Sequence, residues 1–201
     1  MEQPQHLDVS HLPTVAFGSR NQTWWGTIGF MMAETTTLGI FVSSYFYLAR
    51  NRDSWPPGTP LPDLAIPTIV IVFMLLPVIP KAIAIKQGRE LNIGGVIRYA
   101  SIAIALALVG AILRIWEFGA LNVRWDDNAY GSVVWALLCF HTLLLVVDLI
   151  EESVITLFLV SRHREKKHLA DAEESAFYQF FLSSVSVVVY LTIYIAPRVM
   201  R

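Results

Sequence analysis

The sequence predicts an all-α polytopic membrane protein, a bundle of five transmembrane helices. The first observation is composition: the 201 residues are 55% hydrophobic and only 15% charged, and the mean hydropathy is +0.53. Soluble domains carry roughly a quarter charged residues. The second observation is that five apolar stretches are each long enough to cross a bilayer core of about 30 Å as a helix. They lack the alternation of membrane β-strands, so helices are favoured over a barrel.

The five predicted spans follow one another with short polar connections. Their approximate ranges are 24–48, 64–85, 94–116, 131–160 and 177–196. Pro67, Pro77 and Pro80 predict kinks in the second span, because proline removes a helix hydrogen bond. The fourth span is longer than a crossing needs, so it either tilts or projects into water. Residues 1–23 are expected to form an extramembrane segment ahead of a membrane domain over 24–201.

Charge distribution limits the possible partners and predicts the orientation. A net charge of −1 gives no electrostatic reason to bind nucleic acid. The single cysteine, Cys139, cannot form an internal disulfide. Basic residues near span ends are in excess on the side of the N-terminus, which predicts a cytoplasmic N-terminus and a C-terminus outside. The residues on that side are Arg20, Lys86, Arg89, Arg162, Arg164, Lys166 and Lys167, against Arg50, Arg52, Arg124, Arg198 and Arg201.

Ionisable residues inside the spans are the candidates for function, because a charge in hydrocarbon is costly. Glu34 lies deep in the first span, where a carboxyl is expected to pair, to bind a proton or to line a path. Lys81 and Arg114 lie nearer the ends of the second and third spans. Long basic side chains in such positions are expected to extend their charged ends to the membrane surface.

The fourth span contains "CFHTLLLVVDLIEESVI", residues 139–155. At 100° per residue, His141, Asp148 and Glu152 share one face of a helix and Glu151 points away. Asp148 and Glu152 are expected near or beyond the membrane edge. A metal site is not favoured, because metal sites in bundles use Glu-x-x-His pairs on several helices. No other span carries a histidine, so His141 is more typical of a packing residue.

Enzyme motifs are missing from the sequence. It has no Gly-rich phosphate loop, no convincing nucleophile–base pair and no histidine set for haem or copper. If the chain belongs to a catalytic system, the redox chemistry is expected elsewhere. A small transporter whose path uses Glu34, His141 and Asp148 is an alternative, although no internal repeat is visible.

Several segments, in order along the chain, resemble subunit III of the haem–copper respiratory oxidases in its five-helix bacterial form. They are "WWGTIGFMMAETTTLGIFVSSYFYL", "LAIPTIVIVFMLLPVIPKAIAIKQGRE", "RIWEFGAL", "DDNAYGSVVWALLCFH" and "ESAFYQFFLSSVSVVVYLTIYI". Glu34 falls on the family's buried acid and Phe30 on an aromatic residue one turn earlier. Glu117 falls on the glutamate of the helix-end signature, and His141 on the first histidine of the Phe-His run.

The sequence also departs from the family pattern, which indicates a divergent branch. Cys139 and Asp148 stand where the family commonly has glycine, and Leu144 stands where a second histidine is common. The last helix usually opens Tyr-Trp-His-Phe. Here the corresponding run is Tyr-Gln-Phe-Phe, residues 178–181, so Gln179 replaces the tryptophan.

The resemblance implies a non-catalytic subunit of a proton-pumping terminal oxidase in the bacterial cytoplasmic membrane. Such a subunit binds no haem or copper itself; these groups are expected in partner subunits. The implied partners are subunit I, subunit II, small subunits, phospholipids, and cytochrome c through the complex. Cytochrome c is favoured over quinol as the electron donor. An accessory subunit of a nitric oxide reductase is the alternative within this class.

The resemblance also suggests roles for individual residues. Glu34 and His141 are expected to form a buried hydrogen-bonded pair that supports proton uptake. The candidates for lipid contact are Trp24, Phe30 and Glu34. The candidates for contact with a partner at the inner face are Asp148, Glu152 and Glu117.

Overall fold

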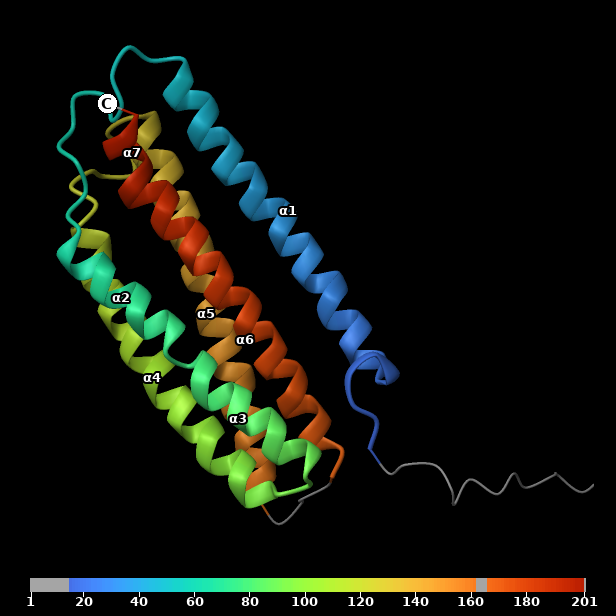
Figure 1. The fold of residues 1–201 in the computed structure, drawn as a ribbon. Coiled ribbons are helices and arrows are strands. Elements are labelled where there is room, and N and C mark those ends of the chain that lie inside the picture. Colours follow the sequence, from blue (N-terminus) through green and yellow to red (C-terminus); the bar gives the residue numbers. More distant parts are fainter. Residues whose placement is uncertain (1–14, 162–165, 201) are drawn as a thin grey trace, which may run out of the picture.

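The computed structural model describes residues 15–161 and 166–200, and these form a bundle of long helices without β-strands. The elements are η1 (Gly18–Arg20), α1 (Gln22–Arg50), α2 (Ala65–Leu75), α3 (Val78–Arg89), α4 (Ile93–Gly119), α5 (Ala129–Val160), α6 (His168–Tyr190), the π-helical turn η2 (Leu191–Ile195) and α7 (Ala196–Val199). The pairs α2–α3 and α6–α7 each continue along one line (Figure 1). The all-α class predicted from the sequence is therefore confirmed.

Asparagine side chains fix the starts of three long helices. Asn21, Asn92 and Asn128 each accept a hydrogen bond from a backbone N–H in the first turn of α1, α4 and α5. This satisfies one of the N–H groups that a helix start leaves without a partner.

Proline explains the division of the second rod into α2 and α3. The helix is interrupted at residues 76–77, where Pro77 cannot donate a backbone hydrogen bond. The interruption falls at Pro77, one of the three prolines where the sequence predicts a kink. Pro67 and Pro80 lie in the first turns of α2 and α3, where the missing N–H costs little, and neither interrupts its helix.

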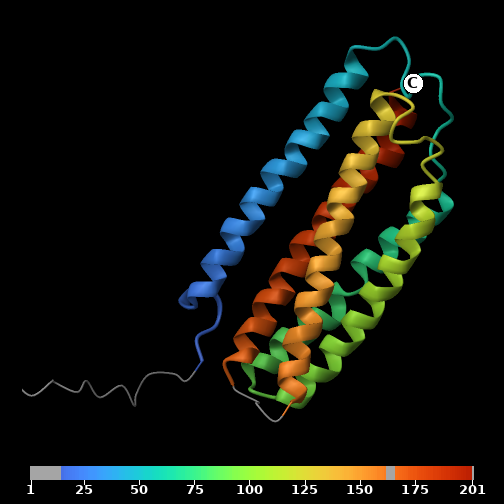
Figure 2. The ribbon, with the colours of Figure 1, turned by 180° about the vertical axis from the view of Figure 1, so that it is seen from behind.

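The rods α2–α3, α4, α5 and α6 pack around one another, and α1 packs outside them against α5 and α6 (Figures 1 and 2). The end of α1 is held by the rings of Tyr45, Trp55 and Tyr130. The Trp55 ring meets the other two edge to face, with ring centroids 5.4 Å from Tyr45 and 5.2 Å from Tyr130. At its start, Asn21 donates to the Glu174 carboxylate of α6 at 2.6 Å. The helix α1 is thus attached at both ends.

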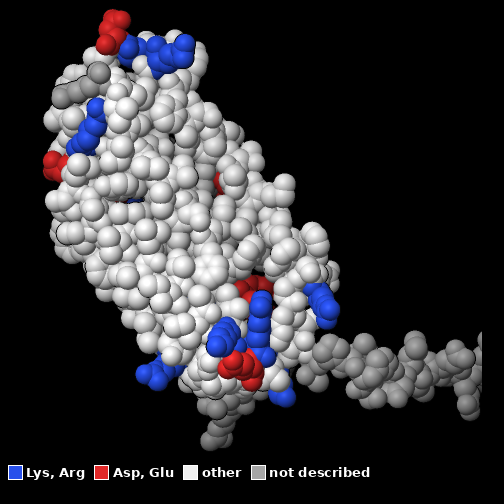
Figure 3. Space-filling view, viewed as in Figure 1, with Lys and Arg blue, Asp and Glu red and all other residues white. Residues whose placement is uncertain are grey.

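Within the described residues, four helical segments are long and apolar enough to cross a membrane, in agreement with the polytopic membrane protein that the sequence predicts. They are Ala65–Arg89, Ile93–Gly119, Ala129–Val160 and His168–Val199. On the face shown in Figure 3, charged side chains gather at the two ends, and the broad band between them shows only small traces of charged atoms. The helix α1 is not among the four, so the fifth span remains a prediction.

The last rod begins earlier than predicted. The helix α6 starts at His168 rather than near residue 177, and Leu169, Ala170 and Ser175 are already buried in its first turns. Residues 161–176 are rich in charged side chains, so the apolar face of the first turns of α6 was not recognised in the sequence. The orientation count used Arg162, Arg164 and Arg201, which lie outside the described residues, as does most of the predicted segment 1–23.

Candidate functional site

A stripe of polar side chains runs along the face of α6 that points into the bundle. Ser175, Gln179, Ser183 and Ser186 are spaced three or four residues apart, so they lie on one side of the helix. All four are at most 3% exposed. The stripe connects two groups of buried ionisable residues, one toward each end of the bundle.

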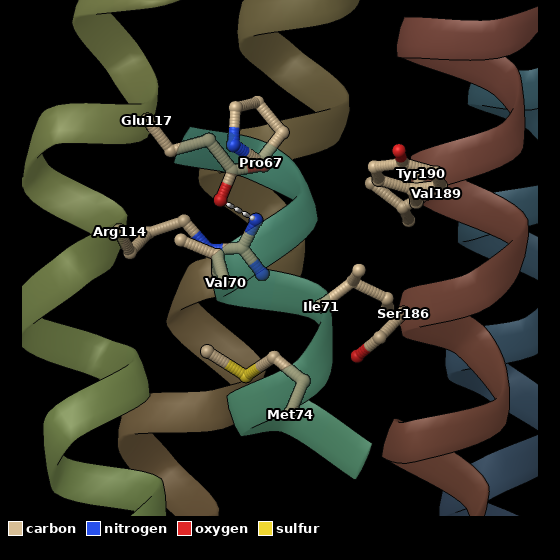
Figure 4. A pocket seen from close by; sticks show the side chains of 9 residues that line it. All are labelled: Pro67, Val70, Ile71, Met74, Arg114, Glu117, Ser186, Val189 and Tyr190. Carbon is tan, nitrogen blue, oxygen red and sulfur yellow. Dashed lines mark hydrogen bonds and ion pairs between the residues drawn. The ribbon is translucent and has the colours of Figure 1, made fainter. Parts of the chain in front are cut away.

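The first group, the Arg114 cluster, contains Arg114, Glu117, His141, Ser186 and Tyr194. Arg114 Nη1 donates to Glu117 Oε2 at 2.7 Å, as Figure 4 shows, and Arg114 Nη2 lies 3.0 Å from His141 Nδ1. Tyr194 donates its hydroxyl to Glu117 Oε1 at 2.9 Å. The cluster therefore ties α4 to α5 and to the π-helical turn η2.

The partners of His141 define its tautomer. A guanidinium only donates, so Nδ1 accepts from Arg114 and the ring carries its hydrogen on Nε2. That hydrogen points to Ser186 Oγ at 3.1 Å, and the Ser186 hydroxyl donates to the Leu182 carbonyl at 2.8 Å. Both ring nitrogens and both Glu117 oxygens have partners. The charges of Arg114 and Glu117 cancel, so the cluster is neutral.

One donor of this cluster faces a small cavity. Arg114 Nε has no hydrogen-bond partner among the described residues. A cavity of about 10 Å³ lies beside the guanidinium, between α2, α4 and α6 (Figure 4). Such a volume holds about one water molecule, which could accept from this N–H.

The second group, the Lys81 cluster, contains Lys81, Asp148, Glu152, Ser175 and Gln179. Lys81 Nζ lies 2.9 Å from Glu152 Oε1 and donates to Ser175 Oγ at 3.1 Å. Asp148 lies one turn before Glu152 on the same face of α5. Each member of the cluster is 2% exposed. The cluster joins α3, α5 and α6.

Glu34 makes a separate contact between α1 and α6. The Tyr178 hydroxyl lies 2.7 Å and 2.9 Å from the two carboxylate oxygens. Glu34 is 4% exposed, so it is enclosed between helices even though α1 lies on the outside of the bundle.

The hydrogen bond predicted between Glu34 and His141 is wrong. Tyr178 bonds Glu34, whereas Arg114 and Ser186 occupy the two nitrogens of His141. The reason is the position of α1, which meets α5 and α6 from outside, while His141 faces α4 and α6 inside the bundle.

The predicted lipid contacts are partly corrected. Glu34 is buried and does not face lipid. Phe30 is 51% exposed and lies on the outer surface. Trp24 is half-buried, because its ring stacks on Phe177 of α6 at 6.1 Å. Whether Phe30 and Trp24 contact lipid remains a proposal.

The predicted inner-face contacts are also corrected. Asp148 and Glu152 share the buried face of α5 with His141, as their spacing predicts, but both lie inside the bundle rather than at its aqueous edge. Glu117 lies near the end of α4, toward the opposite end of the bundle from the Lys81 cluster, and is buried (Figure 1). The three carboxyls therefore form no common contact surface.

Lys81 and Arg114 do not extend to the membrane surface. Both are buried and paired, Lys81 with Glu152 and Arg114 with Glu117. Their positions near the ends of the second and third spans led to the prediction that they reach the membrane surface. Instead, each side chain points to its acidic partner: Lys81 to Glu152 on α5, and Arg114 to Glu117 one turn later on α4.

The α6 stripe was missed in the sequence. Its signal is the regular spacing of Ser175, Gln179, Ser183 and Ser186 within an apolar span, which helical periodicity reveals. Within residues 15–161 and 166–200, no three His, Cys, Asp or Glu side chains are grouped so that they could hold a metal ion.

Two apolar grooves lie between α1 and α6. One has a volume of about 280 Å³ and the other about 420 Å³, and Thr35 and Phe181 line both. The remaining lining residues carry no charge. The grooves thus continue one another along the seam where α1 rests on the bundle.

Comparison with known proteins places the chain in a family. The model of cytochrome c oxidase subunit III matches residues 11–197. Cytochrome c oxidase subunit 3 of Struthio camelus is 26% identical over 191 residues, covering 92% of this chain and 72% of that protein. The Rattus norvegicus protein of the same name is 27% identical over the same shares. The Synechocystis protein is 22% identical over 203 residues, covering 94% and 83%. The chain belongs to the cytochrome c oxidase subunit III family, and it is a subunit III of a haem–copper oxidase.

Proposed function

We propose that this subunit is non-catalytic and packs beside a haem- and copper-bearing subunit I, with subunit II and small subunits as further neighbours. The complex would reduce oxygen to water with electrons from cytochrome c and pump protons. The family match over residues 11–197 is the observation that carries this proposal. The proposed location is a bacterial cytoplasmic membrane, with the N-terminus cytoplasmic and the C-terminus outside.

The outer surface supports a role inside a membrane complex. Large apolar side chains are exposed along several helices, among them Met32 (67%), Ile115 (70%) and Leu157 (67%). An isolated soluble protein does not expose so much apolar surface, so these faces fit contact with lipid or with other subunits.

Co-purification tests the proposal. A tagged chain extracted from native membranes in mild detergent should bring down a subunit with haem and copper, and the complex should consume oxygen. Turnover of nitric oxide instead of oxygen would identify the chain as an accessory subunit of a nitric oxide reductase. A chain that purifies without any haem protein would overturn the assignment of partners.

The grooves between α1 and α6 suit the acyl chains of phospholipids. Their lining is apolar and uncharged, and the two volumes continue along the helix axes. Val185→Trp should fill the groove and reduce the phospholipid that co-purifies with the complex. Leu157→Trp, at an exposed position of α5 outside the groove, is the matched control. Equal lipid in both variants would contradict the proposal.

Glu34 is the residue that we propose supports proton uptake. It is a buried carboxyl that accepts a hydrogen bond from Tyr178 and has no cationic partner among the described residues. Its neutral replacement, Glu34→Gln, should slow oxygen turnover of the complex while the haem content stays constant. Unchanged turnover, with Glu34→Gln present in the complex at normal stoichiometry, would remove this role.

A further inference from the structure

Asp148 and Gln179 face one small internal cavity. The cavity has a volume of about 10 Å³ and is bounded by α2, α4, α5 and α6, and its other lining side chains are apolar. Among the described residues, Asp148 Oδ1 and Gln179 Oε1 have no hydrogen-bond partner. Both side chains are 98% buried, since each is 2% exposed. Two acceptors thus belong to residues that line one cavity, and neither has a protein donor among the described residues.

The orientation of the Gln179 amide follows from its neighbours. Its Nε2 donates to Ser183 Oγ at 3.3 Å, and the Ser183 hydroxyl donates to the Met74 carbonyl at 2.9 Å. Rotating the amide to donate to Asp148 would break this chain of bonds. Gln179 therefore presents an acceptor to the cavity.

The charges around Asp148 do not balance. The charged or titratable groups near Asp148 are Lys81 on α3, Glu152 on α5, Glu34 on α1 and Tyr178 on α6, with Glu151 on the exposed side of α5. The residues of α2 and α4 that line the cavity are uncharged. Lys81 is already held by Glu152 and Ser175. An ionised Asp148 would therefore add an uncompensated negative charge inside the membrane domain, which is strongly unfavourable.

We propose that Asp148 is a proton-binding site of the folded subunit, and that its acid O–H is directed to Gln179 Oε1, directly or through one water in the cavity. The proton supplies the missing donor and removes the excess charge. The cavity volume suffices for one water molecule, which has polar partners on both sides. This inference rests on the packing of α5 and α6 and does not depend on the role proposed for the complex.

Infrared spectroscopy of the full-length chain in lipid nanodiscs tests the site. Asp148 is the one buried aspartate of the described residues, so isotope-labelled aspartate distinguishes it from the glutamates. The labelled chain should show the carbonyl band of a protonated acid at neutral pH, and Asp148→Asn should lose it. Glu152→Gln, the control, should keep it. Absence of the band, or its persistence in Asp148→Asn, overturns the proposal.

Thermal unfolding provides a second readout. Asn at position 148 can donate to Gln179 as the protonated acid does, so Asp148→Asn should melt within a degree or so of the wild type. Asp148→Leu has no donor and should melt several degrees lower. Adding Gln179→Leu to Asp148→Leu removes the unpaired acceptor and should recover part of the loss. Equal losses in Asp148→Asn and Asp148→Leu would show that an ionised Asp148 is required.

Discussion

The Arg114 and Lys81 clusters lie in the same bundle, are buried to the same degree and differ in charge balance. The Arg114 cluster pairs one cation with one carboxylate, and each acceptor of Glu117 and His141 has a donor. Around the Lys81 cluster, a single buried cation faces Asp148, Glu152 and the nearby Glu34.

The difference indicates two uses of buried polarity. A neutral set of residues in which every acceptor has a donor fixes the relative positions of helices, because a change in protonation or rotamer breaks a bond. A set with more acceptors than donors needs protons from outside the chain. The Arg114 cluster is therefore structural, whereas the Lys81 cluster can bind a proton.

The largest effect is expected for Arg114→Met. It leaves the Glu117 carboxylate buried without its counter-charge and His141 Nδ1 without a donor. Removing one member of a buried ion pair costs about 3–5 kcal/mol. Thermal unfolding in detergent should fall accordingly, or the chain should fail to accumulate in membranes. Ile115→Met, at the adjacent exposed position, is the control and should match the wild type. Equal stability of the two variants would contradict a structural role for Arg114.

Lys81→Met should cost less than Arg114→Met, although Lys81 is equally buried. Arg114 donates to two acceptors, Glu117 and His141, whereas Lys81 pairs with Glu152 and donates to the Ser175 hydroxyl, which is itself a donor. Its loss therefore leaves fewer unsatisfied acceptors, and the expected cost is about 1–3 kcal/mol. Adding Glu152→Gln to Lys81→Met should restore part of the stability measured by thermal unfolding. The contrast between the clusters is lost if Lys81→Met is as damaging as Arg114→Met and Glu152→Gln gives no recovery.

His141→Leu tests how far the Arg114 cluster depends on its neutral member. The substitution leaves Arg114 Nη2 without an acceptor, whereas Ser186 keeps its bond to the Leu182 carbonyl. We expect a loss of about 1–3 kcal/mol in the free energy of unfolding. His141→Gln retains an acceptor oxygen and should lose less. No difference between Leu and Gln at this position would mean that the imidazole acts through its volume alone.

The sequence predicted the helical rods and the set of ionisable residues that share one face of α5 correctly, because both depend on local periodicity. Five apolar stretches gave the rods, and a rotation of 100° per residue placed His141, Asp148 and Glu152 together. The break at Pro77 also follows from the chemistry of one residue. Such features need no knowledge of neighbouring helices.

The partners of the buried residues could not be predicted, because they depend on how the helices pack. The sequence analysis paired Glu34 with His141, but the outer position of α1 directs Glu34 to Tyr178 instead. Asp148 and Gln179 were each noted as departures from the family pattern. Only the packing of α5 against α6 shows that both line one cavity.

The smallest effect is expected for Glu34→Gln, which tests whether α1 belongs to either cluster. Glu34 has one hydrogen-bonding partner in the described residues, the Tyr178 hydroxyl, and the glutamine carbonyl can accept the same bond. The loss should therefore be about 0.5–1.5 kcal/mol, the difference between a charged and a neutral acceptor. Glu34→Leu removes the acceptor and should cost more in thermal unfolding. If instead Glu34→Gln stabilises the chain, the negative charge of Glu34 beside the acidic groups around Lys81 costs more than its bond to Tyr178 stabilises α1, and Glu34 belongs to the surroundings of the Lys81 cluster.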